Sequence, residues 1–212
     1  MIIIMSGDEK DVHITNNTKA WDRGLVDRRE SVAPYVPTPQ SLVNTMLEMA
    51  NAGPGDVVYD LGCGDGRFLI TAIRDYNVDK AVGYEITPQL AKMARDNVAE
   101  NDYTTKITIE NTDFMEADFS EATLITLYLT TSGNAQLRPK FRKELKEGAR
   151  VISHDFPITG WVTANEDNEP IKVDTHKVYY YTIPDAYTRN PEQEQEESGA
   201  RWGRIKKLFE RL

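Results

Sequence analysis

Residues 57–68 read Val-Val-Tyr-Asp-Leu-Gly-Cys-Gly-Asp-Gly-Arg-Phe, and this stretch predicts how the chain folds. A short apolar run ends in an acid, three alternating glycines follow, and an amphipathic segment begins beyond them. Glycine lets a turn take positive φ and lets a ligand approach the backbone closely. The start of a helix offers unpaired N–H groups to the same ligand. The stretch therefore predicts a strand, a ligand-binding turn and a helix.

The acid at Asp60 indicates which ligand this turn binds. In a dinucleotide-binding unit, the strand normally leads directly into glycine. A carboxylate at that place would repel a pyrophosphate, but it would attract an ammonium group. We therefore expect a ligand that joins a cationic group to an adenosine, which points to S-adenosylmethionine as the cofactor.

Patterns on both sides of this stretch predict an α/β fold. Thr38 is expected to cap a first helix that begins at Pro39, and a later helix is expected to end at Gly148. Apolar runs predict further strands at 80–85, 106–110, 122–129, 150–154, 158–163 and 171–183, with no helix between the last two. Strands that alternate with helices form a parallel sheet. We expect a Rossmann-like, doubly wound, mostly parallel seven-stranded sheet with an antiparallel final strand.

The composition is that of an ordinary globular protein. Of 212 residues, 40% are hydrophobic and 28% are charged, which suits one domain with a full core. No apolar run approaches the roughly 20 residues that span a bilayer, so no transmembrane segment is expected. The single cysteine, Cys63, excludes an internal disulfide and is typical of a reducing compartment. We therefore expect a cytoplasmic protein.

The two ends of the chain differ in composition from its middle. Residues 1–30 are polar and lack periodicity, so we expect a flexible arm before an α/β domain at 31–184. An acidic linker at 185–200 leads to a basic amphipathic helix at 201–212. A dozen residues are marginal as an isolated helix. We expect this tail to dock, on its own domain in preference to a partner or an anionic membrane surface.

The net charge of −9 bears on the partners. Residues 201–212 hold five basic side chains and one acidic one, so the rest of the chain is more acidic still. Such a body repels the phosphates of nucleic acids, which basic surfaces bind. It attracts basic partners. We expect basic or lysine-rich proteins as partners and no nucleic acid.

Acids and glycines at the ends of the first two strands form a candidate cofactor site. Asp60 would accept from the cofactor's ammonium, and Gly62 and Gly64 would bring bare backbone close to its methionine part. Glu85 ends the second strand 19 residues after Gly66, where an acid can bind both ribose hydroxyls. Taken alone, Glu85 is better explained as a solvated turn residue. Together with the glycine turn, it favours a binding site.

The end of the third strand and the segment before the first helix add further candidates. Asp113 and Phe114 could bind the adenine, although a helix cap and a core phenylalanine explain them almost equally well. Tyr35 is placed to close over the cofactor, and Thr38 lies beside it. We expect all four to contact the cofactor.

Polar side chains at the ends of the fourth and fifth strands are the candidates for the reaction itself. Tyr128 and Thr130 close the fourth strand, and His154 closes the fifth, beside the expected position of the transferred methyl. With Tyr35 they form the expected catalytic set. A lone histidine at a strand end is more often structural than catalytic. No metal ligands are expected.

Four segments carry a resemblance to a known family. They are residues 34–39, 59–67, 81–85 and 145–154. With them, the chain resembles the class I, seven-β-strand methyltransferases. More narrowly, it resembles the archaeal broad-specificity protein lysine methyltransferases and their mitochondrial eukaryotic relatives, over residues 34 to about 184. Residues 127–131 depart from the more aliphatic version in that family.

The resemblance implies methyl transfer from S-adenosylmethionine to lysine ε-amines of proteins, the enzyme itself included. It also implies that Asp60, Gly62, Glu85 and Asp113 contact the cofactor. Lysine has a pKa near 10.4, so forming the neutral amine at pH 7 costs roughly 4.6 kcal/mol. Desolvation and the adjacent sulfonium would both lower that pKa, so a general base is optional.

Two other functions stay open at this point. One is a methyltransferase that acts on RNA or on a small molecule. The chain lacks the Asn/Asp-Pro-Pro-Tyr motif expected after the fourth strand for amino groups of nucleobases. The other is a cofactor-binding protein without catalytic activity, which the combination of Asp60, the glycines and Glu85 disfavours.

Overall fold

The computed structural model describes residues 35–165 and 168–187. The expected N-terminal arm at 1–30, the basic helix at 201–212 and most of the acidic linker lie outside these residues. The first three residues of that linker, Asp185–Tyr187, form the short helix η3. Among the described helices, none has the length and apolar character needed to cross a membrane.

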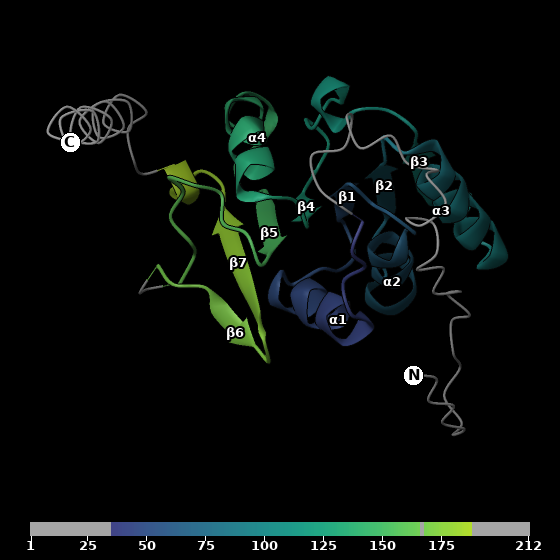
Figure 1. Ribbon diagram of the computed structural model, residues 1–212, viewed down its shortest axis with the longest axis horizontal. Helices are drawn as coiled ribbons and strands as arrows, with labels where there is room; N and C mark the ends of the chain where they lie inside the picture. Colours follow the sequence, from purple (N-terminus) through teal and green to yellow (C-terminus); the bar gives the residue numbers. More distant parts are fainter. Residues whose placement is uncertain (1–34, 166–167, 188–212) are drawn as a thin grey trace, which may run out of the picture.

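Seven strands form one mixed sheet in the order β3-β2-β1-β4-β5-β7-β6 (Figure 1). The strands are β1 (Val57–Leu61), β2 (Lys80–Tyr84), β3 (Ile107–Glu110), β4 (Leu124–Leu127), β5 (Arg150–His154), β6 (Ile171–Val173) and β7 (His176–Thr182). Strands β1 to β5 pair in parallel, whereas β7 runs antiparallel to both of its neighbours. The expected mostly parallel sheet with an antiparallel final strand is confirmed.

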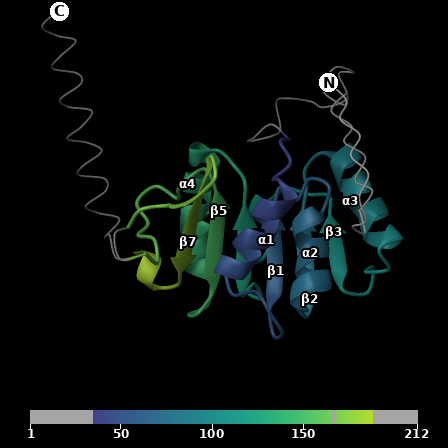
Figure 2. The same ribbon diagram turned by 90° about the horizontal axis from the view of Figure 1, so that it is seen from below.

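Helices cover both faces of this sheet. They are α1 (Gln40–Met49), α2 (Arg67–Tyr76), α3 (Pro88–Glu100) and α4 (Thr131–Glu144), with a short helix η2 at Phe114–Glu116. Helices α1 and α2 lie on one face and α4 on the other (Figure 2). From β1 the chain continues to β2, which pairs with one edge of β1, whereas β4 pairs with the other edge of β1. Ligands of doubly wound sheets bind at such a switch point, at the carboxyl ends of the strands.

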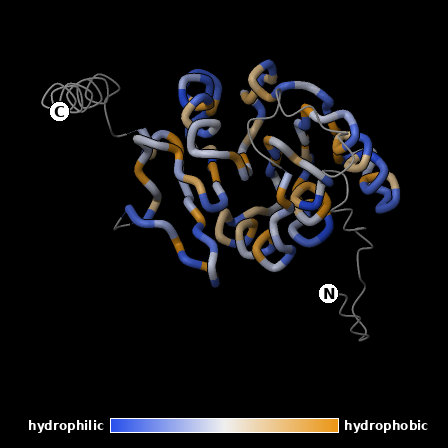
Figure 3. Tube along the Cα trace, in the orientation of Figure 1, coloured by the Kyte–Doolittle hydropathy of each residue, from blue (hydrophilic) through white to orange (hydrophobic). Residues whose placement is uncertain are grey.

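Two hydrophobic cores, one on each face, fix the sheet between the helices. Because side chains alternate along a strand, Val58 packs into the core of α1 and α2, and its neighbour Tyr59 packs into the core of α4. Figure 3 shows hydrophobic residues along the strands and on the helix sides toward them, with hydrophilic residues on the outer side of α3. This burial holds the carboxyl ends of β1, β2 and β4 side by side.

The strand predicted at 158–163 is absent. Gly160 has φ +81°, and the Trp161 N–H donates to the Ile158 carbonyl, so this segment forms a turn. The apolar side chains of Ile158 and Trp161 are buried in the core of α4, which is why the segment resembles a strand in sequence. The sixth strand lies within 171–183 instead, where Asp174, at φ +52°, opens the turn between β6 and β7.

Two helix ends also differ from the prediction. Helix α1 begins at Gln40 and its cap position is Pro39, because the Thr38 hydroxyl binds His154 instead of the helix backbone. Helix α4 ends at Glu144 rather than at Gly148. The backbone becomes extended at Leu145, and the Leu145 side chain is buried. Gly148, at φ +84°, belongs to the turn that enters β5.

Candidate active site

Three buried carboxylates surround the glycine turn at the carboxyl ends of β1 and β2. Asp60, Asp65 and Glu85 expose 4%, 2% and 6% of their surface. One cation, Arg67, pairs with Asp65. Burial of a charge is costly unless it is compensated. The site is therefore short of positive charge and suited to a cationic ligand.

Asp60 occupies the last part of β1, beside β4. The Thr126 hydroxyl on β4 donates to Asp60 Oδ1 at 2.6 Å, across the register pair of these two residues. Burial raises the pKa of Asp60 to about 7, and the charges of Asp65 and Glu85 add to this effect. A neighbouring ammonium would oppose this shift and favour the carboxylate.

Glu85 follows β2 and fastens the glycine turn. Its Oε2 accepts from the Gly64 N–H at 3.0 Å, and its Oε1 accepts from the Thr87 N–H at 2.9 Å. Burial raises its pKa, and these backbone hydrogen bonds act against that shift. Glu85 is therefore buried at the turn and is not a solvated turn residue.

The glycines of the turn have different surroundings. Gly62 is exposed, with φ +83°. Gly64 is covered by Tyr35, because a Cβ at this position would lie 2.6 Å from Tyr35 Cε2. Gly66, at φ +81°, precedes α2. Cys63, between Gly62 and Gly64, is buried. Burial together with the nearby carboxylates raises the pKa of its thiol well above the usual value. Gly62 is therefore the exposed glycine of this turn, whereas Gly64, which was also expected to contact the cofactor, is covered by Tyr35.

Arg67 ties the segment before α1 to this turn. Its guanidinium donates to both carboxylate oxygens of Asp65 and, through Nη1, to the Thr38 carbonyl at 2.8 Å. The Tyr35 hydroxyl interacts with the same ion pair, and burial raises the pKa of Tyr35. The Tyr35 ring therefore lies over the backbone of Gly64.

Asp113 and Phe114 lie at the start of η2, beyond β3. The Asp113 side chain caps this helix by accepting from the Met115 N–H at 2.8 Å. Phe114 is half-buried and packs against the core of α4. Both structural explanations weighed from the sequence are therefore satisfied, and neither prevents contact with an adenine.

An aromatic stack marks the ends of β4 and β5. The rings of Tyr128 and His154 stack with their centroids 3.8 Å apart, and the Phe156 ring stacks against Tyr128 with a centroid distance of 6.3 Å. His154 is fully buried, and burial lowers its pKa to about 4. At neutral pH its imidazole is therefore uncharged. Phe156 is 36% exposed, which gives the stack an open end.

Thr130, the last expected catalytic residue, caps α4. Its hydroxyl accepts from the Gly133 N–H at 3.1 Å and lies 3.0 Å from the Ser132 hydroxyl. Such a cap stabilises a helix by about 1 kcal/mol. This contact accounts for the threonine independently of any reaction.

Known proteins identify the family. Residues 60–165 match the family model of the ANTKMT methyltransferase domain. A protein-lysine N-methyltransferase of Saccharolobus islandicus is 49% identical over 71% of this chain and 93% of its own length. The chain belongs to this methyltransferase family. Its cofactor is S-adenosylmethionine, as the carboxylates around the glycine turn indicate.

Other relatives widen the comparison. The adenine nucleotide translocase lysine N-methyltransferase of Mus musculus is 29% identical over 71% of this chain, which spans 63% of that protein. An RNA methyltransferase of Salinibacter ruber, solved with S-adenosyl-L-homocysteine, is 41% identical, with a TM-score of 0.67 over 74% of this chain and 97% of its own. The tRNA methyltransferase of B. subtilis, at 17% identity, shares the fold alone, with a TM-score of 0.57.

Sequence patterns do not single out three parts of this site. Asp65 and Arg67 fall inside the turn motif, although two opposite charges beside buried glycines signal an ion pair. Thr126 is an isolated polar residue within an apolar strand, which is a signal for a buried partner. His176 carries no signal, because its proximity to His154 depends on the antiparallel pairing of β5 with β7.

Proposed function

We propose that this protein transfers the methyl group of S-adenosylmethionine to lysine ε-amines of other proteins and of itself. The observation that carries the cofactor part of the proposal is the set of three buried carboxylates with one arginine at the glycine turn. The lysine acceptor expected from the sequence agrees with the names of two relatives, a protein-lysine N-methyltransferase and an adenine nucleotide translocase lysine N-methyltransferase.

The residues around the turn bind and orient the cofactor. In this proposal Asp60 accepts from the ammonium, the exposed backbone of Gly62 lies along the methionine part, and Glu85 binds the ribose. Asp113 and Phe114 hold the adenine, and Tyr35 with Thr38 covers the site. When bound, the cofactor supplies a methyl group on a positively charged sulfur.

The aromatic stack receives the acceptor. Tyr128 and the partly exposed Phe156 form a wall at the ends of β4 and β5, the strands that follow β1 in the order of the sheet. A lysine side chain against this wall loses water, which lowers its pKa and favours the neutral amine. His154, fully buried behind Tyr128, positions that ring, and solvent water takes the proton. Thr130 holds the start of α4 beside it.

Charge and composition support the choice of substrate and location. The net charge of −9 favours basic, lysine-rich substrates. The single buried Cys63 fits a cytoplasmic location. The greater identity to the Saccharolobus protein than to the mouse protein supports an archaeal type. For the basic segment at 201–212 we propose docking on the domain itself, with membrane contact as the alternative.

RNA methylation is the second candidate, because the Salinibacter ruber relative carries that description. One experiment separates the two. The full chain is incubated with methyl-labelled S-adenosylmethionine and a mixture of basic proteins and total RNA, and each fraction is digested and analysed by mass spectrometry. We expect labelled lysines in the protein fraction and none after Asp60→Ala. Label confined to RNA would overturn the lysine assignment.

A further inference from the structure

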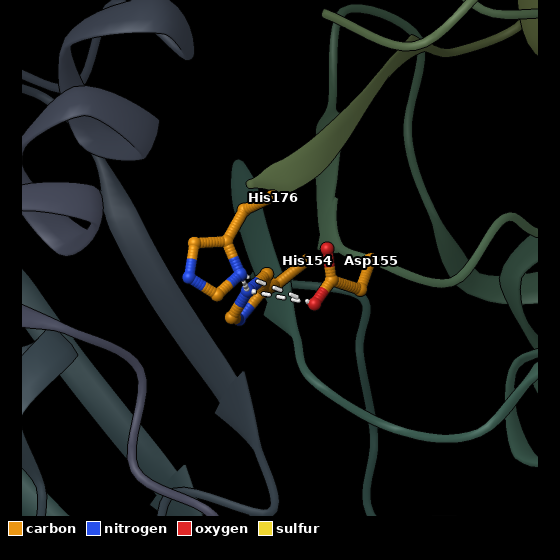
Figure 4. A group of neighbouring side chains, drawn as sticks. All are labelled: His154, Asp155 and His176. Atoms are coloured by element: carbon orange, nitrogen blue, oxygen red, sulfur yellow. Dashed lines mark hydrogen bonds and ion pairs between the residues drawn. The ribbon is translucent and has the colours of Figure 1, made fainter. Parts of the chain in front are cut away.

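Three side chains outside the cofactor site converge on one point. His154 and Asp155 come from the end of β5, and His176 comes from the start of β7 (Figure 4). His154 Nε2 lies 2.9 Å from His176 Nδ1 and 3.2 Å from Asp155 Oδ2, and His176 Nδ1 lies 3.2 Å from the same oxygen. Among the described residues, this is the group of His, Cys, Asp and Glu side chains with the spacing of metal ligands.

Hydrogen bonds alone satisfy this triangle poorly. Its three sides are nearly equal, so the two partners of each atom lie about 60° apart in direction, whereas a hydrogen bond prefers to be nearly straight. A proton on a ring nitrogen lies in the ring plane and can point well at one partner only. With both protons directed at Asp155 Oδ2, the two ring nitrogens still lie 2.9 Å apart with no proton between them. A cation at the centre would interact with all three atoms at once.

The surroundings hold each donor in place. The Lys177 N–H donates to Asp155 Oδ1 at 2.8 Å, which leaves Oδ2 directed at the two imidazoles. Asp155 has φ +57°, a conformation that brings its side chain to the same side as that of His154. On the far side of the His154 ring, Nδ1 lies 3.1 Å from the Thr38 hydroxyl. A metal-binding histidine almost always has such a second partner, which fixes its tautomer.

We propose that His154 Nε2, His176 Nδ1 and Asp155 Oδ2 bind one zinc ion per chain. Imidazole and carboxylate ligands suit zinc, which is bound at about 2.0–2.2 Å. Bonds of that length reach all three atoms from a point about 1 Å outside their plane. His176 and Asp155 are 29% and 28% exposed, so the ion can enter from solvent and water can complete the tetrahedron. The ion would fasten the β6–β7 hairpin to the end of β5.

The test measures metal binding directly and does not depend on which acceptor the enzyme methylates. The full chain is stripped with a chelator, desalted and titrated with zinc chloride by calorimetry, and with cobalt(II) by visible absorption. We expect one site with the strong visible bands of tetrahedral cobalt. His176→Ala should weaken zinc binding by more than about 100-fold, since even partners of ligands contribute about 10–100-fold. Thr38→Val, which removes such a partner, should cost about tenfold or more.

Two further variants decide the matter if one substitution affects folding. Asp155→Asn removes the charge and tolerates the positive φ, so it should weaken binding while circular dichroism stays unchanged. Asp174→Asn is the matched control, because Asp174 is exposed on the same hairpin with φ +52° and lies outside the trio. Equal zinc affinity in wild type, Asp155→Asn and His176→Ala, or no cobalt absorption in the wild type, would overturn the proposal and leave a hydrogen-bonded trio.

Discussion

Asp60 combines burial with a position suited to binding a cation. It is buried beside two other acids, so its pKa rises to about 7, and it lies where the cofactor's ammonium is proposed to bind. A ligand cation would restore the charged form. Binding of the cofactor and loss of a proton from Asp60 are therefore linked, and each favours the other.

This linkage predicts how cofactor affinity changes with pH. Below pH 7 the free protein holds Asp60 protonated, so binding must release that proton and the affinity falls as the pH falls, by up to about tenfold per unit. Above pH 7 the affinity levels off. Calorimetric titration with S-adenosylhomocysteine between pH 5.5 and 7.5 measures the slope. Asp60→Asn should bind about 10–100-fold more weakly, because a charged hydrogen bond contributes about 1.5–3 kcal/mol, and should lose the slope. A slope that persists in this variant would show that another group titrates.

Gly64 gives a prediction about stability. Alanine at this position takes an unfavourable φ of +54° and places its Cβ 2.6 Å from the Tyr35 ring. We expect Gly64→Ala to destabilise the protein by about 2–3 kcal/mol, of which about 1–2 kcal/mol comes from the backbone. Urea denaturation measures it. Gly148→Ala is the matched control, because Gly148 has φ +84° and nothing within 4 Å of its Cβ. Equal losses in the two variants would mean that Tyr35 does not press on the turn.

Residue types predicted the donor side of this site better than the acceptor side. Asp60, the glycines and Glu85 lie within 26 residues of sequence, on two adjacent strands, so their proximity follows from local pattern and the rule for parallel sheets. The neighbours of His154 do not follow from such local patterns. Thr38 is 116 residues away and His176 belongs to an antiparallel strand, so pairing and register had to be known first.

At the scale of elements, one ion pair holds the segment before α1 to the start of α2. The Asp65 and Arg67 side chains are 2% and 12% exposed. Removing one partner of a buried pair costs about 3–5 kcal/mol, because the other charge is left alone. We expect Arg67→Met to destabilise by about 3 kcal/mol in chemical denaturation. Arg74→Met is the matched control, since the Arg74–Asp75 pair is about a third exposed and should contribute less than about 1 kcal/mol.

The double variant Asp65→Asn/Arg67→Met completes this test. With both charges removed, we expect part of the lost stability to return, as it does when buried ion pairs are replaced as a unit. A double variant that loses the sum of the two single effects would show that the two residues act separately.

Helices and strands could be predicted where the buried residues recur at the spacing typical of one kind of element. Strand β5 was predicted with its observed bounds, because the β-branched residues Val151 and Ile152 form its middle and the strand lies between β4 and β7. The strand prediction for 158–163 was wrong, because Ile158 and Trp161 are buried through a turn at Gly160. Burial makes residues apolar whether the backbone is extended or turned, so hydropathy alone cannot separate the two.

At the scale of the whole molecule, the net charge of −9 predicts a salt effect on substrate binding. Exposed charges are screened over about 10 Å at 0.1 M salt and about 3 Å at 1 M. We expect KM for a lysine-rich basic protein to rise several-fold between 0.05 and 0.5 M salt, while kcat changes little. Steady-state assays measure both. A neutral peptide that carries one lysine serves as the control and should show no such rise. A salt-insensitive KM for the basic protein would mean that net charge does not select the substrate.

Cys63 has a practical consequence for studying this enzyme. It is the chain's one thiol, it is 4% exposed, and its pKa is raised, so very little reactive thiolate exists near neutral pH. Thiol-specific maleimide and nitroxide reagents should therefore not label Cys63. A cysteine introduced at exposed Val36, next to Tyr35, would then be the single labelled position without any prior removal of native cysteine. The native sequence can therefore be used directly for single-site labelling. A fluorescent or spin label at position 36 would report whether the segment over the glycine turn moves when the cofactor binds.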